Sequence, residues 1–430
     1  MKNLNICIAG LGNVGSAVVS VIEKNSQYIK NKSNLTINII GLSAKNKDKD
    51  RNFNVRDYKW IENPIDLLNI NDSKPDILIE LIGYEKGLSY ELVKTALNQK
   101  INVVTGNKAM LAMYGQELFR IADQNQVSLL FEAAVAGGIP IIKTLKNNIF
   151  LNKIKKISGI LNGTTNYILT TMETQNKSFD DVLDDAKKRG FTSDNESKLD
   201  IGGYDAAHKL TLLSTIAFGG NVDFNLNQVE GIEKITIEDI NFVKHLGFRI
   251  KLISESFLID NMICSSTKPK LIPLDKPLAN VDGALNAINV ETDQLENLYL
   301  EGEGAGGLAT ASSILSDIFE ISNNSNFRSI GYNINDLKNY QKFDSSNLES
   351  KFYLRLRVKD QPGVLSKITA YLNDSNISVE KILQTPDKKE NNIPILIITH
   401  KIKTSELLNS VNKISDLEFV NENISIIPIE

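Results

Sequence analysis

Asp205 and Lys209 stand four residues apart in GGYDAAHKLTLLS, residues 202–214, a stretch that predicts a helix continuing to Phe218. Residues four apart share one helix face, and here that face also carries the leucines and isoleucines of an apolar arc. The other polar side chains are expected about a quarter turn away, on the polar side: Tyr204, His208, Thr211 and Thr215. Two interpretations remain open. The pair is either a structural salt bridge at the edge of the core, or a catalytic or substrate-binding pair that faces a cleft.

A strand, a glycine-rich turn and an amphipathic helix are predicted over residues 4–25, LNICIAGLGNVGSAVVSVIEKN. Gly10, Gly12 and Gly15 fit the pattern G-x-G-x-x-G, in which the first glycine makes the tight turn, the second lets a pyrophosphate approach the backbone, and the third lets the helix pack on the strand. The helix N-terminus adds free amides and the positive end of its dipole. The motif therefore predicts a dinucleotide site, which also includes Asn13 and Val14; the alternative is a glycine-rich turn without a ligand.

The loop after the second predicted strand bears on the choice of cofactor. The strand LTINIIGL, residues 35–42, continues as SAKNKDK, with no acid before Asp48 to accept the ribose hydroxyls of NAD. Lys45 and Lys47 follow Ser43 closely, and such a basic, hydroxyl-bearing loop suits the extra phosphate of NADP. The sequence thus favours NADP(H) over NAD(H), unless both lysines are simply solvated.

Further strand signals at residues 76–83, 101–106 and 127–133 alternate with helical patterns. This alternation predicts a parallel, doubly wound sheet, whose ligands bind beyond the carboxyl ends of the strands. Lys108 follows one such strand end, so it is either a cleft residue or a surface lysine in the first turn of a helix.

Charge and cysteine content exclude several classes of protein. A net charge of −4 and a pI of about 5.7 give no indication of a nucleic-acid or acidic-membrane partner. Cys7 and Cys264 are the only cysteines and form no CxxC, so neither a disulfide framework nor a zinc site is expected. Because no apolar run reaches membrane-spanning length and a strand begins almost at Met1, we expect a cytoplasmic protein without a signal peptide.

The middle of the chain predicts a different pattern, with mixed strands and helices. NGTTNYIL should begin a helix capped by Thr164 or Thr165, and GFTSDNESKLDIGG should be a polar loop. Strands are expected at 153–161, 227–236, 247–258 and 261–272, a helix at 178–189, and a strand, glycine turn and helix over 297–319. Residues 351–430 form a separate βαββαβ pattern.

Several stretches together resemble homoserine dehydrogenase over the whole chain. They are GLGNVG (10–15), VVTGNKAML (103–111), FEAAVAGGIPII (131–142), GILNGTTNYIL (159–169), DAAHK (205–209) and GEGAGGLATA (302–311). Residues 351–430, with VKDQPGVLSKI and NISVEKILQ, resemble an ACT domain. The resemblance implies reversible NAD(P)H-dependent reduction of L-aspartate 4-semialdehyde to L-homoserine, on the route to threonine, methionine and isoleucine.

The resemblance also implies an α/β architecture in parts. These are a Rossmann-type doubly wound domain (1–135, completed by about 305–320), an α+β catalytic and dimerisation domain (136–304) and a βαββαβ ACT domain (351–430). The polar, Asn- and Ser-rich composition of residues 321–350 predicts a linker or a stretch of surface loops. A homodimer or homotetramer is expected.

Site residues carry over by resemblance. Lys209 becomes the proton donor to the aldehyde oxygen and Asp205 a substrate-binding acid, which favours the catalytic interpretation of the pair. Lys108 becomes a cofactor-side lysine close enough to assist, and Gly306 a cofactor contact.

The loop ahead of DAAHK departs from the family pattern. A substrate-binding glutamate is expected eleven residues before the aspartate, where this chain has Asp194 in a loop with one extra residue. Asp194 could still meet the substrate ammonium, Glu196 is its rival, and either could be a solvated loop acid.

A monovalent-cation site (Na⁺ or K⁺) carries over to Glu132, Val135, Gly137 and Ile139, three of them through backbone carbonyls. A carboxylate with carbonyl oxygens suits a hard cation. The site would brace the link between the two domains.

The C-terminal module carries none of the residues assigned to chemistry. Pro362 and Gly363 lie at a strand-to-helix turn whose amides could receive a carboxylate, with Asp360 and Asn376 nearby for an amino acid's polar groups. Threonine is the expected effector; the alternative is a module that only holds the oligomer together. Two further functions also remain open: an enzyme acting on another semialdehyde or amino acid, and a catalytically silent sensor of NADP and amino acids.

Overall fold

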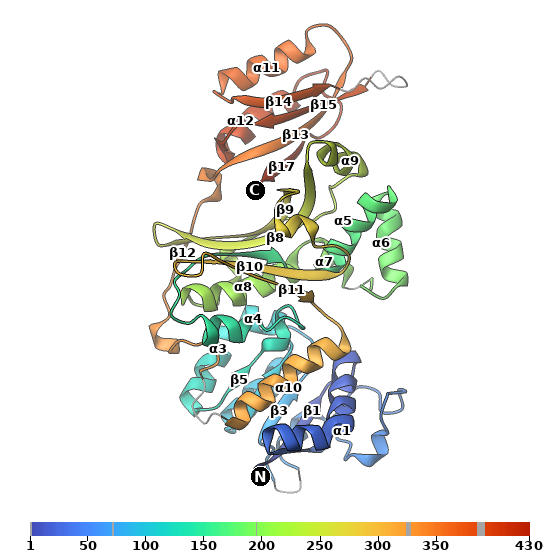
Figure 1. Cartoon of the computed structure of the whole chain (residues 1–430), viewed down its shortest axis with the longest axis vertical. Helices are drawn as coiled ribbons and strands as arrows, with labels where there is room; N and C mark the ends of the chain where they lie inside the picture. Colours follow the sequence, from blue (N-terminus) through green and yellow to red (C-terminus); the bar gives the residue numbers. More distant parts are fainter. Residues whose placement is uncertain (1, 71–72, 195, 324–327, 385–391) are drawn as a thin grey trace.

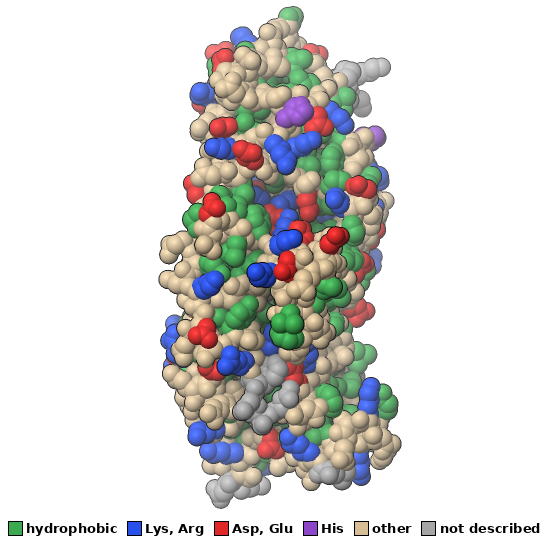
Figure 2. Space-filling view, turned by 60° about the vertical axis from the view of Figure 1, so that its left-hand side comes forward, with side chains coloured by type: hydrophobic (Ala, Val, Ile, Leu, Met, Phe, Trp, Pro, Cys, Tyr) green, Lys and Arg blue, Asp and Glu red, His purple; other side chains and the backbone are tan. Residues whose placement is uncertain are grey.

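The computed structural model describes residues 2–70, 73–194, 196–323, 328–384 and 392–430. Three layers follow one another along the long axis: a parallel sheet with the N-terminus, a mixed sheet in the middle, and the C-terminal module (Figure 1). Acidic and basic side chains lie interspersed along the face shown in Figure 2. Among the described residues, no helix is long and apolar enough to cross a membrane.

The N-terminal layer is the predicted doubly wound sheet, with all strands parallel in the order β2-β1-β3-β4-β5. Its strands are β1 (Lys2–Ala9), β2 (Leu35–Ser43), β3 (Ile77–Glu80), β4 (Asn102–Thr105) and β5 (Leu129–Leu130), and its helices are α1 (Asn13–Ser33), α2 (Leu88–Asn98) and α3 (Lys108–Asn125). The chain leaves β1 for β2 on one side and returns to β3 on the other. In doubly wound sheets, ligands bind beyond the carboxyl ends of the strands where the strand order reverses, here at the end of β1.

A helix from much later in the chain completes this layer. α10 (Gly307–Asn323) lies beside α1 and buries Ala311, Ile314 and Ile318 in the same apolar cluster. The two helices run in the same direction: a Cβ on Gly307 would lie 3.1 Å from the Asn13 carbonyl, and Lys2 Nζ donates to the Ser322 carbonyl at 2.5 Å near their far ends. Two helix N-termini therefore meet at the same edge of the sheet.

The middle layer is a mixed sheet covered on one face by helices. Its strands are β6 (Ile154–Ile160), β7 (Asn227–Val229), β8 (Phe248–Ile259), β9 (Met262–Pro273), β10 (Leu285–Thr292) and β11 (Asn297–Glu303). Its helices are α4 (Ile141–Lys143), α5 (Gly163–Gln175), α6 (Phe179–Lys188), α7 (Ser197–Ile201), α8 (Tyr204–Phe218) and α9 (Ile237–His245).

Three local expectations for this layer were wrong. Only the first three residues of the expected strand 227–236 pair, and the polar loop 190–203 contains α7. The cap of α5 is Asn162, whose side chain accepts from the Thr165 backbone N–H. An extended residue directly before the first helical turn makes this bond, and that residue lies two positions before Thr164 and three before Thr165.

Of the expected polar side of α8, Tyr204 is exposed but the other three residues are not. His208, Thr211 and Thr215 are all buried, because the helix runs between the sheet and the N-terminal layer. Thr211 Oγ1 accepts from Asn227 Nδ2 at 2.9 Å, and the His208 ring packs on the Phe224 ring.

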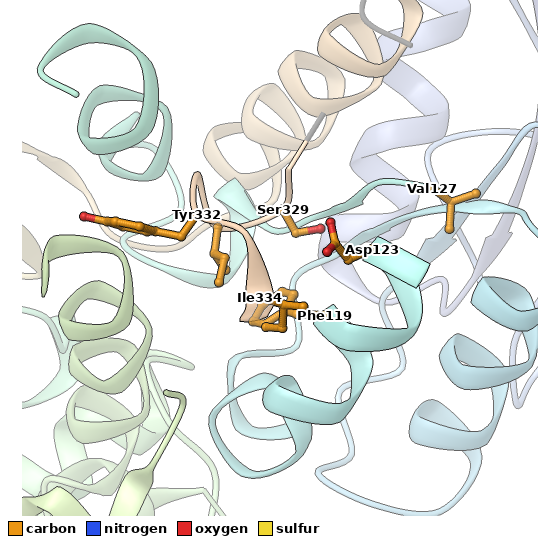
Figure 3. Close-up of a pocket in the computed structure, with 7 residues that line it drawn as sticks. Phe119, Asp123, Val127, Ser329, Tyr332 and Ile334 are labelled. Atoms are coloured by element: carbon orange, nitrogen blue, oxygen red, sulfur yellow. The ribbon is translucent and has the colours of Figure 1, made fainter. Parts of the chain in front are cut away.

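Residues 328–348, within the segment expected to be a linker or a stretch of surface loops, lie along the first two layers. Lys338 pairs with Gly220, β12 (Gln341–Lys342) pairs with β9, and Tyr340 is buried. Ser329 Oγ accepts from the Leu129 backbone N–H. A cavity of about 10 Å³, room for one water, separates this segment from the C-terminal part of α3 (Figure 3).

The C-terminal module has the predicted βαββαβ order. It comprises β13 (Glu349–Lys359), α11 (Val364–Asp374), β14 (Val379–Gln384), β15 (Asn392–Thr399), the short β16 (Ile402–Lys403), α12 (Thr404–Ser415) and β17 (Ser425–Ile429). β17 pairs with β9 through Ile429 and Leu271, so the sheets of the middle layer and of the module are continuous.

Candidate active site

The acid–lysine pair of α8 lies at the boundary between the first two layers and meets a second lysine there. Lys209 Nζ donates to Asp205 Oδ2 at 2.8 Å and to the Leu161 carbonyl at 2.6 Å. Lys108 Nζ, from the N-terminal layer, lies 3.1 Å from Asp205 Oδ1. The structure thus brings together all three residues predicted to act in catalysis.

The charges of this cluster support one another. Burial opposes the charge of Asp205, but Lys108 and Lys209 outweigh burial and hold the pKa of that carboxyl well below its usual range. In turn, the charge of Asp205 raises the pKa of Lys108. The site therefore presents two ammonium groups on either side of one carboxylate.

The elements around Lys108 fix where it points. The Asn107 side chain caps α3 by accepting from the Met110 backbone N–H, and its Nδ2 donates to the Tyr84 carbonyl at 2.7 Å. Thr105 Oγ1 donates to the buried Glu80 carboxylate at 2.6 Å. These bonds tie the start of α3 to the loop after β3, so Lys108 projects from a rigid strand-to-helix turn.

Two residues of the cluster were not found from the sequence. Asp200 lies beside Asp205, and Asn162 Nδ2 donates to both carboxylates, at 2.7 and 2.8 Å. Thr192 Oγ1 donates to the other oxygen of Asp200 at 2.7 Å. Burial and the charge of Asp205 raise the pKa of Asp200. A signal did exist, because Asp200 precedes Asp205 by five residues across a Gly-Gly turn that folds one acid back towards the other.

The two rival acids of the altered loop are placed differently. The Asp194 side chain is 88% exposed and lies 2.9 Å from Lys187 at the end of α6, outside the cluster. Glu196 accepts from Ser193 Oγ at 2.9 Å, and its charge contributes to the raised pKa of Lys108. Glu196 is therefore the nearer acid to the cluster.

The glycine turn leaves room for a pyrophosphate. Gly10 has φ +99°, and a Cβ there would lie 2.3 Å from the Leu81 carbonyl. A Cβ on Gly15 would lie 2.0 Å from the Gly10 carbonyl, so that glycine permits the close approach of helix and strand. No described atom lies within 4 Å of a Cβ on Gly12, and no described side chain caps α1. The backbone amides at the start of α1, which include those of Asn13 and Val14, therefore have no side-chain cap and fit the pyrophosphate of a dinucleotide.

The basic loop beside this turn holds Lys45 and Lys47 exposed. Arg51, which belongs to no motif in the sequence, organises the loop. Its guanidinium donates to the carbonyls of Lys47 and Lys49 at 3.0 and 2.8 Å and to Leu11 of the glycine turn at 3.4 Å, and it lies over the Trp60 ring. On the other side of the turn, Gly306 is exposed at the start of α10 with φ +116°.

The candidate cation ligands lie at the junction of the layers. Both Glu132 carboxylate oxygens accept backbone N–H groups, from Ile142 at 2.8 Å and from Lys143 at 2.9 Å. The Gly137 carbonyl accepts from Ser313 Oγ at 2.6 Å. Burial and the charge of Asp317 raise the pKa of Glu132 to about 7. No group of three or more His, Cys, Asp or Glu side chains in the described part of the chain could hold a metal ion.

Comparison with known proteins agrees with this arrangement. Three family models match: the homoserine dehydrogenase NAD-binding domain over residues 10–132, homoserine dehydrogenase over 140–319, and the ACT domain over 352–419. Homoserine dehydrogenases of Neisseria gonorrhoeae and Bacillus subtilis are 34% and 35% identical, covering 100% and 98% of this chain and 99% and 97% of theirs.

Solved structures show the same relationship. The crystal structure of a homoserine dehydrogenase from Thiobacillus denitrificans has a TM-score of 0.91 at 34% identity, covering 100% of this chain and 98% of that one. A hyperthermophilic archaeal homoserine dehydrogenase in complex with NADPH has a TM-score of 0.61 at 28% identity, covering 75% and 98%. The chain belongs to the homoserine dehydrogenase family, as an NAD(P)-dependent oxidoreductase with a C-terminal ACT domain.

Proposed function

We propose that this enzyme reversibly reduces L-aspartate 4-semialdehyde to L-homoserine with NADPH, on the route to threonine, methionine and isoleucine. The observation that carries the proposal is the buried Lys209 ammonium, held between Asp205 and the Leu161 carbonyl at the boundary of the nucleotide layer. An ammonium has three N–H donors, and these two bonds leave one for a substrate oxygen.

A nicotinamide cofactor held at the Gly10–Gly15 turn would supply the hydride that the carbonyl carbon receives. Lys209 gives its free N–H to the carbonyl oxygen and then the proton, so that negative charge does not accumulate there. In the oxidising direction the same nitrogen receives the hydroxyl proton. Lys108 approaches from the cofactor side and adds a second positive charge.

The acids of the site have two different roles, one towards the lysines and one towards the substrate. Asp205 was predicted to bind substrate, but its oxygens are engaged by Lys108, Lys209 and Asn162. We infer that it also fixes the two ammonium groups. Asp200 and Glu196 are then the better-placed acids for the substrate ammonium, and Asp194 is the third candidate.

NADPH preference rests on the loop after β2. Lys45 and Lys47 are exposed beside the glycine turn, and no acid precedes Asp48. The archaeal relative bound to NADPH supports the same choice.

The Na⁺ or K⁺ site remains a proposal. Glu132 and Gly137 already accept hydrogen bonds, but each of these oxygens keeps a second lone pair, and Val135 and Ile139 could add carbonyls. Turnover in Na⁺, K⁺ or tetramethylammonium buffers of equal ionic strength tests the site, and equal rates and equal thermal stability in all three would exclude it.

Feedback by threonine at the ACT domain is proposed on the exposed turn that begins α11. Gly363 has φ +91°, and no described side chain caps this helix, so its amides are open to a carboxylate. Replacing Asp360 with alanine and Asn376 with glycine, which keeps the left-handed backbone of that residue (φ +54°), should abolish threonine inhibition and keep basal turnover. If millimolar threonine and related amino acids do not change wild-type turnover, the ACT domain has a structural role instead. It would then hold together a homodimer or homotetramer.

A turnover assay tests the reaction itself. Aspartate semialdehyde with NADPH should be the best combination, ahead of NADH and of longer semialdehydes. A preference for another semialdehyde would instead assign the altered loop 190–196 to a different substrate.

A further inference from the structure

One side chain touches both acids of the site. Asn162 lies between β6 and α5, is 4% exposed, and donates through Nδ2 to Asp200 Oδ1 and Asp205 Oδ2. Its Oδ1 accepts the Thr165 backbone N–H at 2.8 Å. The orientation of the amide is fixed, because the reversed amide would place an acceptor against two carboxylates and a donor against an N–H group.

The backbone beside Asn162 serves the same cluster. The preceding carbonyl, of Leu161, holds the Lys209 ammonium, and that ammonium shares Asp205 Oδ2 with Asn162 Nδ2. Gly163 follows directly, where a Cβ would lie 2.6 Å from the Ala284 carbonyl, so the junction packs tightly against the chain before β10. The β6–α5 junction therefore fixes the proton donor and both acids from one rigid position.

We infer that Asn162 is a positioning residue: it holds the Asp200 and Asp205 carboxylates at a fixed separation and keeps Asp200 ionised to receive the substrate ammonium. The inference rests on the proposed function. Two carboxylates this close repel each other, and a donor shared between them stabilises both charges. Asn162 supplies this donor without adding charge of its own.

Asp200 is the acid that most needs this help. Asp205 forms salt bridges with two lysines, whereas Asp200 accepts hydrogen bonds from Thr192 and Asn162. The charges that face it are Asp205 and Lys209 from α8, with Lys108 of α3 and Glu196 of the loop around the same cluster. Burial and Asp205 raise the pKa of Asp200, and the two hydrogen bonds oppose that rise. Loss of the Asn162 donor should raise it further.

Two substitutions separate this role from helix capping. Asn162→Ser keeps a cap acceptor but is too short to reach the acids, and Asn162→Asp keeps the shape and the cap but replaces the donor with a charged oxygen. The acidic limb of kcat/KM for the semialdehyde should move to higher pH by about half a unit to one unit in the serine variant, the size of one net hydrogen bond, and by more in the aspartate variant. The KM for NADPH should change less than about twofold, because the glycine turn lies in another layer.

Ser178→Ala is the matched control, because Ser178 caps the neighbouring α6 and touches neither acid. This variant should lower the unfolding temperature and leave the acidic limb of the kcat/KM profile at its wild-type pH. A second readout needs no turnover: in enzyme with ¹³C-labelled aspartate carboxyls, the resonance assigned by Asp200→Asn should titrate at higher pH in both Asn162 variants.

The outcomes are distinct. A wild-type enzyme that does not reduce aspartate semialdehyde fails the proposed function, and the Asp200 titration then decides the effect of Asn162 by itself. Folded Asn162→Asp with an unmoved limb and an unmoved Asp200 resonance overturns the inference, as does an equal shift in Ser178→Ala.

Discussion

Replacing Lys209 with alanine should lower kcat by about 10²–10³, which corresponds to about 3–4 kcal/mol of lost transition-state stabilisation. The size follows from the site: two of the three ammonium N–H bonds are held by protein, so the third is pre-aimed at the oxygen on which charge develops. NADPH binding should be retained, because the glycine turn belongs to the N-terminal layer and Lys209 to the middle one.

The variant should remain folded. It leaves the Leu161 carbonyl without its donor, a cost of about 1–3 kcal/mol against a typical total stability of about 5–15 kcal/mol. Lys108 stays beside Asp205 and compensates part of its charge. The assay is steady-state oxidation of NADPH with the semialdehyde, together with a fluorescence titration of NADPH and a thermal unfolding curve.

Lys244→Ala is the control, because this exposed lysine of the same layer lies 3.5 Å from Glu173 and away from the site, so turnover should stay within about twofold. Near-normal kcat in folded Lys209→Ala would refute the reasoning and return the Asp205–Lys209 pair to a structural salt bridge.

Three further predictions follow from other charges. Lys45→Ala with Lys47→Ala should raise KM for NADPH much more than for NADH, an effect weakened by salt, and equal changes would show that the loop does not read the 2′-phosphate. Glu196→Gln should raise KM for the semialdehyde about tenfold while Asp194→Asn changes it less than about twofold; the reverse order would return the substrate contact to Asp194. Burial opposes the charge of Glu255, but Lys270 and Lys156 lower the pKa of its carboxyl to about 2. The contribution of Glu255 to the free energy of unfolding is therefore present above about pH 4.5 and is lost as the pH falls towards 2. In chemical denaturation over that range, the free energy of unfolding should depend less on pH in Glu255→Gln than in the wild-type enzyme. Parallel curves for the two proteins would contradict this stabilising role of the Glu255 charge.

Local patterns predicted the N-terminal layer and the C-terminal module because each is built from regular alternation of strands and helices. The glycine turn after β1, the strand-then-lysine end at Lys108 and the βαββαβ module each depend on neighbours in the sequence. The packing of α10 on α1 depends on residues nearly three hundred positions apart, and only the family resemblance, not periodicity, pointed to it.

The site was harder to predict where a polar side chain acts on something distant in sequence. Asn162 is a helix cap by local rules, yet its second task depends on Asp200 and Asp205 folding back against it. Periodicity placed Thr211 on a polar surface, because helical spacing cannot reveal that Phe224 and Asn227, from a later segment of the same layer, cover that side. Arg51 bonds loop carbonyls that no residue pattern specifies.

The contact between the ACT domain and the middle layer decides how the domain can be tested. The buried Arg355 of β13 donates to both carboxylate oxygens of Asp239, at 2.7 and 3.1 Å, and Asp239 belongs to the capping box of α9. A chain ending near Ser350 would lack Arg355, so Asp239 would lose its guanidinium partner and become exposed. It would also lack β17, which pairs with the edge of β9. We therefore expect truncation to destabilise the middle layer, so lost activity in a truncated chain would not measure regulation. Point variants at the exposed α11 turn leave Arg355 and β17 in place, and a change in threonine response there, at unchanged unfolding temperature, reports on the effector alone.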